Sequence, residues 1–323
     1  MQLYVHIPFC KSKCRYCDFN SYACFDDATI LRYLNGLNRE IELTADKFCR
    51  SKIDTIYIGG GTPSVLGETD VKSVADTIKT HFDLSTLKEW TIECNPESIT
   101  ESKLGAYRDI GINRISIGVQ SLDDRNLKAI GRIHSSEVAL EKIILANKYF
   151  DNVSCDLIIG LPFDDENSVR REVSALAPLV KHISMYELIV EDGTPLKSMV
   201  ERGEIILPCD DDTQSLFEAA MDEAKKRGFQ RYEVSNFAKD GLISRHNFGY
   251  WTREEYLGLG AGAYSLVKTE DGSKILDKDK RFANVKDVNQ YIRYIENAQK
   301  FDDIDRIDVE YLCDKDVRNE TIM

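Results

Sequence analysis

The sequence predicts an α/β fold in which an incomplete parallel (β/α)6 barrel is followed by an α+β C-terminal extension. From residue 1 to about residue 188, short β-branched or aromatic runs alternate with longer segments of helical period. This is the pattern of βα units around a parallel sheet. Six such units, in place of the eight of a closed barrel, leave an open side. After residue 190 the pattern changes to helices around irregular strand-like pieces, and we expect that part to cover the open side.

The expected elements follow one another along the chain by residue number. Strands are predicted over 3–7, 55–58, 91–94, 114–119, 154–159 and 182–188. The helices between them are predicted over about 27–48, 68–82, 101–110, 135–149 and 166–179. Beyond residue 190, helices are predicted over about 211–227 and 285–300, and strand-like pieces over 232–237 and 256–267. No Gly/Ser-rich or Pro-rich linker divides the chain, so we expect domains 1–190 and 191–323 to share a tight interface, the second as a lid or extension.

Composition narrows the class of protein. Hydrophobic residues make up 42% of the 323 residues and charged residues 30%, and no stretch approaches the roughly 18 apolar residues that cross a bilayer. The N-terminus shows no export or transit pattern, so we expect a cytoplasmic protein without a membrane span. A peripheral membrane contact is compatible with this expectation. The net charge of −13 opposes binding to a phosphate backbone, so no nucleic-acid partner is expected.

Three of the nine cysteines form the most informative motif. Because their total is odd and no export signal precedes them, the cysteines are interpreted as thiols and not as disulfides. Cys10, Cys14 and Cys17 follow the first strand within eight residues, so their thiolates can surround one soft metal centre. Zinc normally takes four protein ligands, and Cys24 offers a fourth; ordinary buried cysteines are the third reading. The spacing favours a [4Fe–4S] cluster with one iron left open as a substrate site.

Loops of Gly, Pro and Asn follow several predicted strands, at residues 59–63, 95–96 and 160–162. In a parallel βα array these loops gather at the carboxyl ends of the strands, where such folds place ligands. The run from Gly59 to Gly61 lets the backbone approach a ligand closely, although strand-to-helix turns also carry glycines for steric reasons.

Four polar residues sit at or just beyond strand ends, where a hydrophobic sheet would not favour them: Glu93, Gln120, Arg132 and Asp156. An unpaired buried charge is costly, so these side chains need partners. A bound cation or ligand hydroxyl groups would supply them. The alternative is an internal salt bridge of Arg132 with Glu93 or Asp156.

Together, the segment from Tyr4 to Cys10, the C-x3-C-x2-C spacing and the run from Gly59 to Pro63 resemble the radical S-adenosylmethionine superfamily. More narrowly, they resemble its oxygen-independent coproporphyrinogen III oxidase branch over nearly the whole chain. The resemblance implies that the three cysteines hold a [4Fe–4S] cluster whose open iron binds S-adenosylmethionine and whose electron cleaves it to a 5′-deoxyadenosyl radical. The cofactor-binding positions that it implies are Tyr4, Tyr16, Gly60, Gly61, Thr62, Glu93, Gln120, Arg132 and Asp156.

Within this branch two functions are open, decarboxylation of coproporphyrinogen III to protoporphyrinogen IX and haem chaperoning. Phe19 stands where the oxidases carry a fourth cysteine, and only three residues precede Tyr4, so both oxidase features are missing. The segment 246–251, H-N-x-x-Y-W, resembles the signature of the related haem chaperones, which bind haem and hand it to haem-requiring proteins. A histidine can ligate iron and aromatic faces suit a porphyrin, although a histidine beside aromatic residues is more often structural. The haem-binding residues implied are His246, Asn247, Tyr250 and Trp251.

Two further expectations concern partners and the chain end. Lys11, Lys13 and Arg15 surround the cysteine loop of an acidic protein, so an acidic electron donor such as a flavodoxin could dock there; alternatively these cations only neutralise cluster charge. The other partners expected are haem and a haem-acceptor protein. Residues 318–323 look like the first turn of a helix, and relatives usually continue into a small helical domain, so we expect truncation before it or its loss in this lineage.

Overall fold

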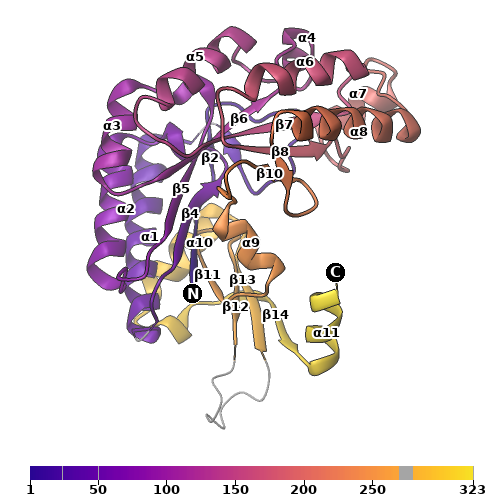
Figure 1. The fold of residues 1–323 in the computed structure, drawn as a ribbon. Coiled ribbons are helices and arrows are strands. Elements are labelled where there is room, and N and C mark those ends of the chain that lie inside the picture. The colour runs from indigo at the N-terminus through magenta and orange to yellow at the C-terminus, as the bar shows by residue number, and fades with distance from the viewer. Residues whose placement is uncertain (24, 50, 269–278, 323) are drawn as a thin grey trace.

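The computed structural model describes residues 1–23, 25–49, 51–268 and 279–322, and its central feature is an open sheet of 12 strands (Figure 1). Through its middle runs a parallel core, in which six strands lie side by side in chain order with helices between them. Within the described part of the chain no strand pairing closes the sheet into a ring, so the predicted α/β fold with an incomplete barrel is confirmed. The six strands are β1 (Gln2–Ile7), β4 (Thr55–Gly60), β5 (Glu89–Cys94), β6 (Arg114–Gln120), β7 (Val153–Ile159) and β8 (His182–Glu187).

Helices cover the outer, convex face of this core (Figure 1). Buried apolar residues at helical spacing, such as Tyr33, Leu37 and Ile41, explain why α1 packs one face on the sheet. The covering helices are α1 (Asp27–Lys47), α2 (Glu68–His81), α3 (Glu101–Asp109), α5 (Ser136–Ala146) and α6 (Glu166–Leu176), close to their predicted ranges. The short α4 (Asp124–Ala129) was not predicted, because six residues are too few to show a helical period.

The cysteine loop begins and ends in a separate two-stranded parallel sheet. Its strands are β2 (Phe9–Cys10) and β3 (Tyr22–Ala23), and the amide of Tyr22 donates to the carbonyl of Pro8 at 2.8 Å. This pairing closes the loop directly beyond the carboxyl end of β1.

The C-terminal part extends the sheet at both of its edges. At one edge β11 (Tyr256–Leu259) pairs in parallel with β1 and is followed by β12 (Tyr264–Val267), β13 (Asp279–Asn284) and β14 (Arg306–Leu312). At the other edge β10 (Asn236–Ala238) and β9 (Gln230–Arg231) run antiparallel beyond β8. The single strand predicted over 256–267 is thus two strands, because Gly260 and Gly262 turn the chain with φ values of +96° and +77°. The helices of this part are α7 (Pro195–Glu201), α8 (Asp210–Lys226), α9 (Arg245–Trp251), α10 (Val288–Asn297) and α11 (Asp314–Ile322).

A buried carboxylate joins α1 to the C-terminal part. Glu40 is fully buried and accepts four hydrogen bonds from that part. Two donors are charged or amide side chains, Arg306 at 3.0 Å and Asn284 at 2.8 Å. The others are the hydroxyl of Tyr291 and the amide of Gly260, both at 2.7 Å. The domain boundary near residue 190 stays a prediction, but this contact holds residues from both sides of it together.

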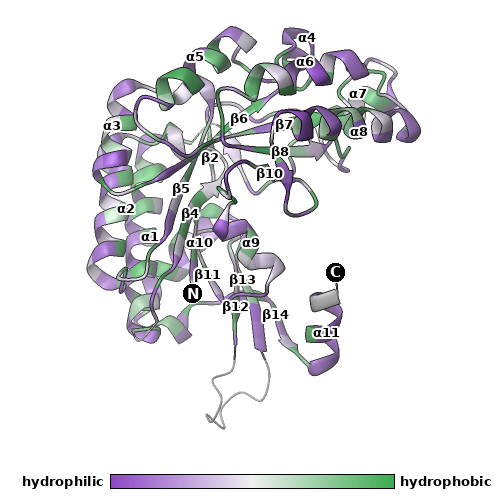
Figure 2. Ribbon diagram, viewed as in Figure 1, coloured by the Kyte–Doolittle hydropathy of each residue, from purple (hydrophilic) through white to green (hydrophobic). Residues whose placement is uncertain are grey.

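The helices show hydrophobic and hydrophilic stretches in alternation, as expected for elements that cover a sheet with one face (Figure 2). In the described part of the chain, none of them combines the length and the apolar composition that a bilayer crossing requires.

Candidate functional site

A cavity of about 420 Å³ lies at the carboxyl ends of the parallel strands. It gathers most of the residues that the sequence singled out, from the cysteine loop, from the ends of β4, β5 and β6, from the middle of β7 and from the segment after α4. Cys10 lines a neighbouring groove of about 780 Å³ together with Lys11, and Tyr4 lines a second cavity described below. The predicted residues that line the first cavity are Cys14, Tyr16, Cys17, Gly60, Gly61, Thr62, Glu93, Gln120, Arg132 and Asp156.

Each sulfur of the cysteine motif has a hydrogen-bond partner. The hydroxyl of Thr62 donates to Sγ of Cys10 at 3.4 Å, and Nη1 of Arg132 donates to Sγ of Cys14 at 3.5 Å. Sγ of Cys17 lies 3.8 Å from the Ser21 hydroxyl. Burial raises the pKa of the Cys10 thiol, and the hydroxyls around it act against that rise.

These residues fit an iron–sulfur cluster. The three cysteines are free thiols, soft ligands of the kind that such clusters take, and donors beside the sulfurs stabilise the charge of thiolate ligands. Within the described residues no three His, Cys, Asp or Glu side chains are grouped as for a single metal ion. Cys24, named above as a fourth zinc ligand, lies outside the described residues.

Two of the three cations of the cysteine loop bind the protein itself. Nζ of Lys13 donates to the carbonyl of Ser21 at 3.1 Å, and Nη1 of Arg15 donates to that of Ala129 at 3.1 Å, at the end of α4. These contacts do not test whether the cations neutralise cluster charge or receive an electron donor, so both readings stay predictions. Lys11 and Lys13 are exposed, and Arg15 is half-buried.

The glycine run after β4 packs against the first strand. A Cβ on Gly60, where φ is +111°, would lie 2.5 Å from the ring of His6, and one on Gly61 would lie 2.8 Å from the carbonyl oxygen of Phe9. Such distances exclude a larger residue at both positions. Glycine is therefore required here for steric reasons within the protein itself. Gly60 and Gly61 also line the cavity.

Two half-buried carboxyl groups line this cavity, and among the ion pairs of the described residues neither is joined to an arginine. Glu93 accepts hydrogen bonds from the Tyr57 hydroxyl at 2.6 Å and the Gly60 amide at 3.1 Å, while burial raises its pKa to about 7. Burial also raises the pKa of Asp156, which accepts from the hydroxyl of Ser116 at 3.4 Å. Opposing these rises, the positive charge of Arg114 on β6 favours both ionised forms.

The salt-bridge alternative for Arg132 is wrong. Among the ion pairs of the described residues none joins it to Glu93 or Asp156; instead its guanidinium donates to Cys14. Its Nη2 donates to Oδ1 of Asn95 at 2.8 Å and to the carbonyl of Gly118 at 2.6 Å. Sequence reasoning missed Asn95 as a site residue, although Asn95-Pro96 was noted as a strand-end loop.

Gln120 has a strained backbone at the end of β6. Its φ is +69°, unusual for a residue with a Cβ, and the pairing of β6 with β7 shifts register between Gly118 and Gln120. The bulge turns the end of the strand so that Gln120 lines the cavity. Strain of this kind persists where surrounding contacts impose it.

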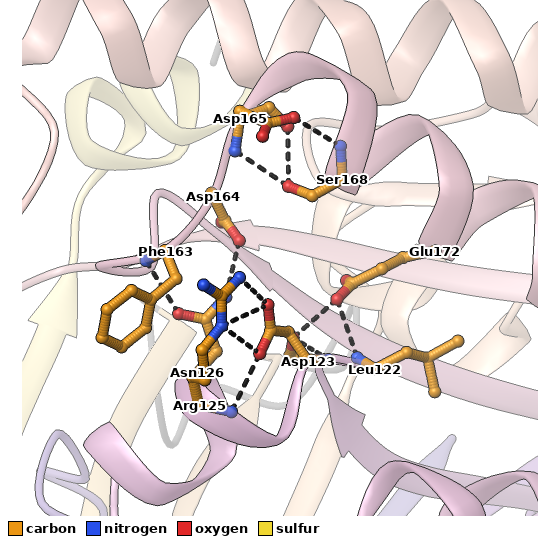
Figure 3. A network of polar contacts seen from close by, with 10 residues as sticks. Leu122, Asp123, Arg125, Asn126, Phe163, Asp164, Asp165, Ser168 and Glu172 are labelled. Atoms are coloured by element: carbon orange, nitrogen blue, oxygen red, sulfur yellow. Dashed lines mark hydrogen bonds and ion pairs between the residues drawn. The ribbon is translucent and has the colours of Figure 1, made fainter.

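Two further carboxyl groups fix the loops after β6 and β7 (Figure 3). Asp164 accepts from the amides of Gly160 and Leu161 at 3.0 and 2.9 Å, and from the amide side chain of Asn126 at 2.8 Å. Glu172 accepts from the Ser121 hydroxyl at 2.6 Å and the Leu122 amide at 2.8 Å. Burial raises the pKa of Asp164 to about 6 and that of Glu172 to about 7. No local sequence signal marks Glu172, which lies in the middle of a helix.

The predicted haem segment, residues 246–251, lies in α9. The helix places the four predicted haem-binding residues in different surroundings. His246 is 1% exposed, with Nδ1 2.8 Å from the Thr55 hydroxyl and Nε2 3.0 Å from that of Tyr250. Burial lowers its pKa to about 3, so the imidazole is neutral. Both ring nitrogens are engaged, so iron ligation by His246 would require Tyr250 to move. Trp251 lies on the outside, 45% exposed, and Asn247 is half-buried.

A second cavity, of about 390 Å³, adjoins the first. Both are lined by Gly60 and Glu93 and by two residues of the cysteine loop, Asp18 and Phe19. Phe19 is 70% exposed at this shared rim. The second cavity is otherwise rich in aromatic rings and carries one lysine; its further lining includes Tyr4, His6, Tyr250, Tyr256, Tyr264 and Lys286.

Comparisons with known proteins concern the family and the fold of this chain. The radical SAM superfamily model matches residues 4–175. The heme chaperone HemW of Bacillus subtilis (strain 168) is 37% identical over 267 residues, 82% of this chain and 70% of that protein. HemW of Lactococcus lactis subsp. lactis (strain IL1403) is 38% identical over 262 residues, 80% of this chain and 68% of that protein. The solved structure of Escherichia coli coproporphyrinogen III oxidase HemN, a radical SAM enzyme, superposes with a TM-score of 0.82 at 21% identity, covering 99% of this chain and 74% of that one.

Proposed function

The chain belongs to the radical SAM superfamily and, within it, to the family of heme chaperones named HemW, and we propose that it is a cytoplasmic haem chaperone. It binds a [4Fe–4S] cluster, S-adenosylmethionine and haem, and delivers haem to haem-requiring respiratory proteins. The observation that carries the proposal is the pair of adjoining cavities, one lined by cysteines and carboxyl groups and the other by aromatic rings.

Cys10, Cys14 and Cys17 would hold the cluster, which when bound supplies the electron for cleaving S-adenosylmethionine. The first cavity would hold S-adenosylmethionine. Its cationic groups suit the carboxylates of Glu93 and Asp156, since a buried carboxylate without a cation is costly. The pKa of about 7 at Glu93 means that a cationic ligand, by favouring the ionised form, draws a proton off this group.

We place haem in the second cavity. Its tyrosine rings offer flat apolar faces, and Lys286 offers a cation for a propionate. Of the four residues implied by the sequence signature, Tyr250 lines this cavity. His246 would hold the Tyr250 hydroxyl in place, and the exposed Trp251 would contact a partner protein.

Two variants, one in the second cavity and one on the outer face of α9, test this placement. Haem titration followed by its Soret absorption should show several-fold weaker binding for Tyr264→Ala, which removes a cavity ring carried by β12. Trp251→Ala, matched in being a partly exposed aromatic residue on α9, should bind haem like the wild type. The reverse pattern would place the haem on the outer face of α9.

Decarboxylation of coproporphyrinogen III is the second candidate. The likeness to HemN concerns the fold alone at 21% identity, and Phe19 occupies the position of the oxidases' fourth cysteine. An anaerobic assay of the reconstituted chain with reductant, S-adenosylmethionine and coproporphyrinogen decides between the two. We expect no catalytic formation of the vinyl product, together with haem transfer to an apo haem protein; catalytic turnover would overturn the chaperone proposal.

A further inference from the structure

A chain of hydrogen bonds connects two of the three motif cysteines through Asn95. From one end, the Thr62 hydroxyl donates to Sγ of Cys10 at 3.4 Å, and Nδ2 of Asn95 donates to Oγ1 of Thr62 at 3.0 Å. From the other end, Arg132 donates to Sγ of Cys14 at 3.5 Å and to Oδ1 of Asn95 at 2.8 Å. Thus the side-chain amide of Asn95 joins the two donors, Thr62 and Arg132.

The direction of each hydrogen bond in this chain is determined by chemistry. A guanidinium only donates, so the group that faces Arg132 must accept. The hydroxyl of Thr62 has a single hydrogen; when this goes to Cys10, its oxygen needs a donor on the other side. The side-chain amide of Asn95 satisfies both groups, because its Oδ1 accepts from Arg132 and its Nδ2 donates to Thr62.

The backbone around Asn95 keeps this amide in place. Its own N–H donates to the Ser64 hydroxyl at 3.1 Å, and the Ser64 hydroxyl lies 2.6 Å from that of Ser98. A Cβ on Gly118 would lie 2.9 Å from Oδ1 of Asn95, so β6 leaves room for the amide only because glycine stands there.

We propose that Asn95 is a positioning residue for the cluster: it orients Thr62 and Arg132 so that the Cys10 and Cys14 thiolates each receive a hydrogen bond. Hydrogen bonds to the sulfurs are one of the factors that set the reduction potential of an iron–sulfur cluster. An isosteric aspartate at position 95 would reverse the direction of the hydrogen bond to Thr62. The Thr62 hydroxyl would then donate to the carboxylate, and Cys10 would lose its donor.

The test measures the midpoint potential of the reconstituted cluster by anaerobic redox titration, followed through the electron paramagnetic resonance signal of the reduced state. Thr62→Val and Asn95→Leu should each shift the potential to a more negative value, because a thiolate with fewer donors favours the oxidised cluster. Since Asn95 acts partly through Thr62, the double variant should shift by less than the sum. Wild-type potential in Asn95→Leu, or strictly additive shifts, would overturn the proposal.

Asn113→Leu is the matched control. Like Asn95, Asn113 accepts one hydrogen bond and donates another through its side-chain amide, from the Trp90 amide at 2.8 Å and to the Lys88 carbonyl at 3.1 Å, but at the other end of the strands. It should leave the potential unchanged. Should Asn95→Leu fail to fold or load, Asn95→Asp, which keeps the size and the Arg132 contact, decides when its potential is measured with and without Thr62→Val. The charge of the carboxylate makes the potential more negative in both backgrounds, so a larger negative shift with Thr62 present supports the proposal and equal shifts end it.

The inference rests on the proposed cluster, and the two can fail separately. Absence of a cluster from the reconstituted wild type would contradict the proposed function. An unchanged potential in the variants, with a cluster present and haem transfer intact, would contradict only the role of Asn95.

Discussion

The hydroxyl of Tyr57 donates a 2.6 Å hydrogen bond to Glu93, the carboxyl group that lines both cavities. Burial raises the pKa of Glu93 to about 7, and the bond from Tyr57 acts against that rise. The ionisation of Glu93 near neutral pH therefore depends on Tyr57. Glu93 is thus placed where its charge acts on both cavities.

Tyr57→Phe should shift the pH dependence of S-adenosylmethionine binding. Without the hydroxyl the pKa of Glu93 rises further, so the rise in affinity that accompanies its ionisation moves to higher pH. Calorimetric titrations of the reconstituted protein between pH 6 and 9 measure this. Tyr186→Phe, in the same cavity, should keep the wild-type profile; an unchanged profile in Tyr57→Phe would mean that the ionised Glu93 does not contribute to binding.

Glu172→Gln should stabilise the protein increasingly as pH rises. The folded pKa of Glu172 is raised to about 7 by burial, so between pH 4.5 and 7 the unfolded chain binds fewer protons and wild-type stability falls. A glutamine can still accept from Ser121 and Leu122, yet it carries no charge. The difference should reach at most about 3 kcal/mol at pH 8. Denaturant titrations at pH 5 and 8 measure it, with Glu166→Gln on the exposed side of α6 as the control.

His246 should produce the opposite pH dependence. Burial lowers its folded pKa to about 3, so stability is full above the unfolded value near 6.5 and is lost as pH falls toward 3. His246→Asn should lose stability at pH 7, where the contacts to Thr55 and Tyr250 are broken. It should, however, show a smaller further loss on acidification. Melting temperatures at pH 7 and 5 test this, and an equal acid sensitivity of both proteins would contradict it.

Glu40→Ala should destabilise the protein strongly, because it leaves the buried guanidinium of Arg306 without its carboxylate. Breaking a buried pair in this way costs about 3–5 kcal/mol. The control is Arg32→Ala, which breaks an exposed bond from α1 to Glu296 of the same C-terminal part and should cost less than about 1 kcal/mol. Similar free energies of unfolding for the two variants would show that Glu40 does not hold the two parts together.

Gly60→Ala should lose both stability and cofactor binding, because its Cβ would collide with the ring of His6. Gly193→Ala isolates the backbone effect: its φ is +79°, and a Cβ there would meet nothing within 4 Å. The control should cost about 1–2 kcal/mol and leave binding intact. If both variants cost the same, the close approach of Gly60 to the first strand would not be a constraint.

Short spacings along the sequence predicted much of this protein. The alternation of strands and helices predicted the parallel core, and the superfamily was indicated by the resemblance of three short segments: residues 4–10, the C-x3-C-x2-C motif and the glycine run after the second predicted strand. These signals are local, because period and spacing are set by neighbouring residues. They were also enough to bring ten of the predicted residues to one cavity, since parallel strands end at one edge of a sheet.

Tertiary structure alone decided which groups meet. Arg132 binds Cys14 and Asn95 in place of the carboxylates, His246 is enclosed with both ring nitrogens engaged, and β11 joins the sheet beside β1 after more than half of the chain has intervened. The partners in each case lie far apart in sequence, and several compete for one donor. Which acceptor binds a given donor depends on packing and desolvation in the folded interior, and the local sequence does not determine these.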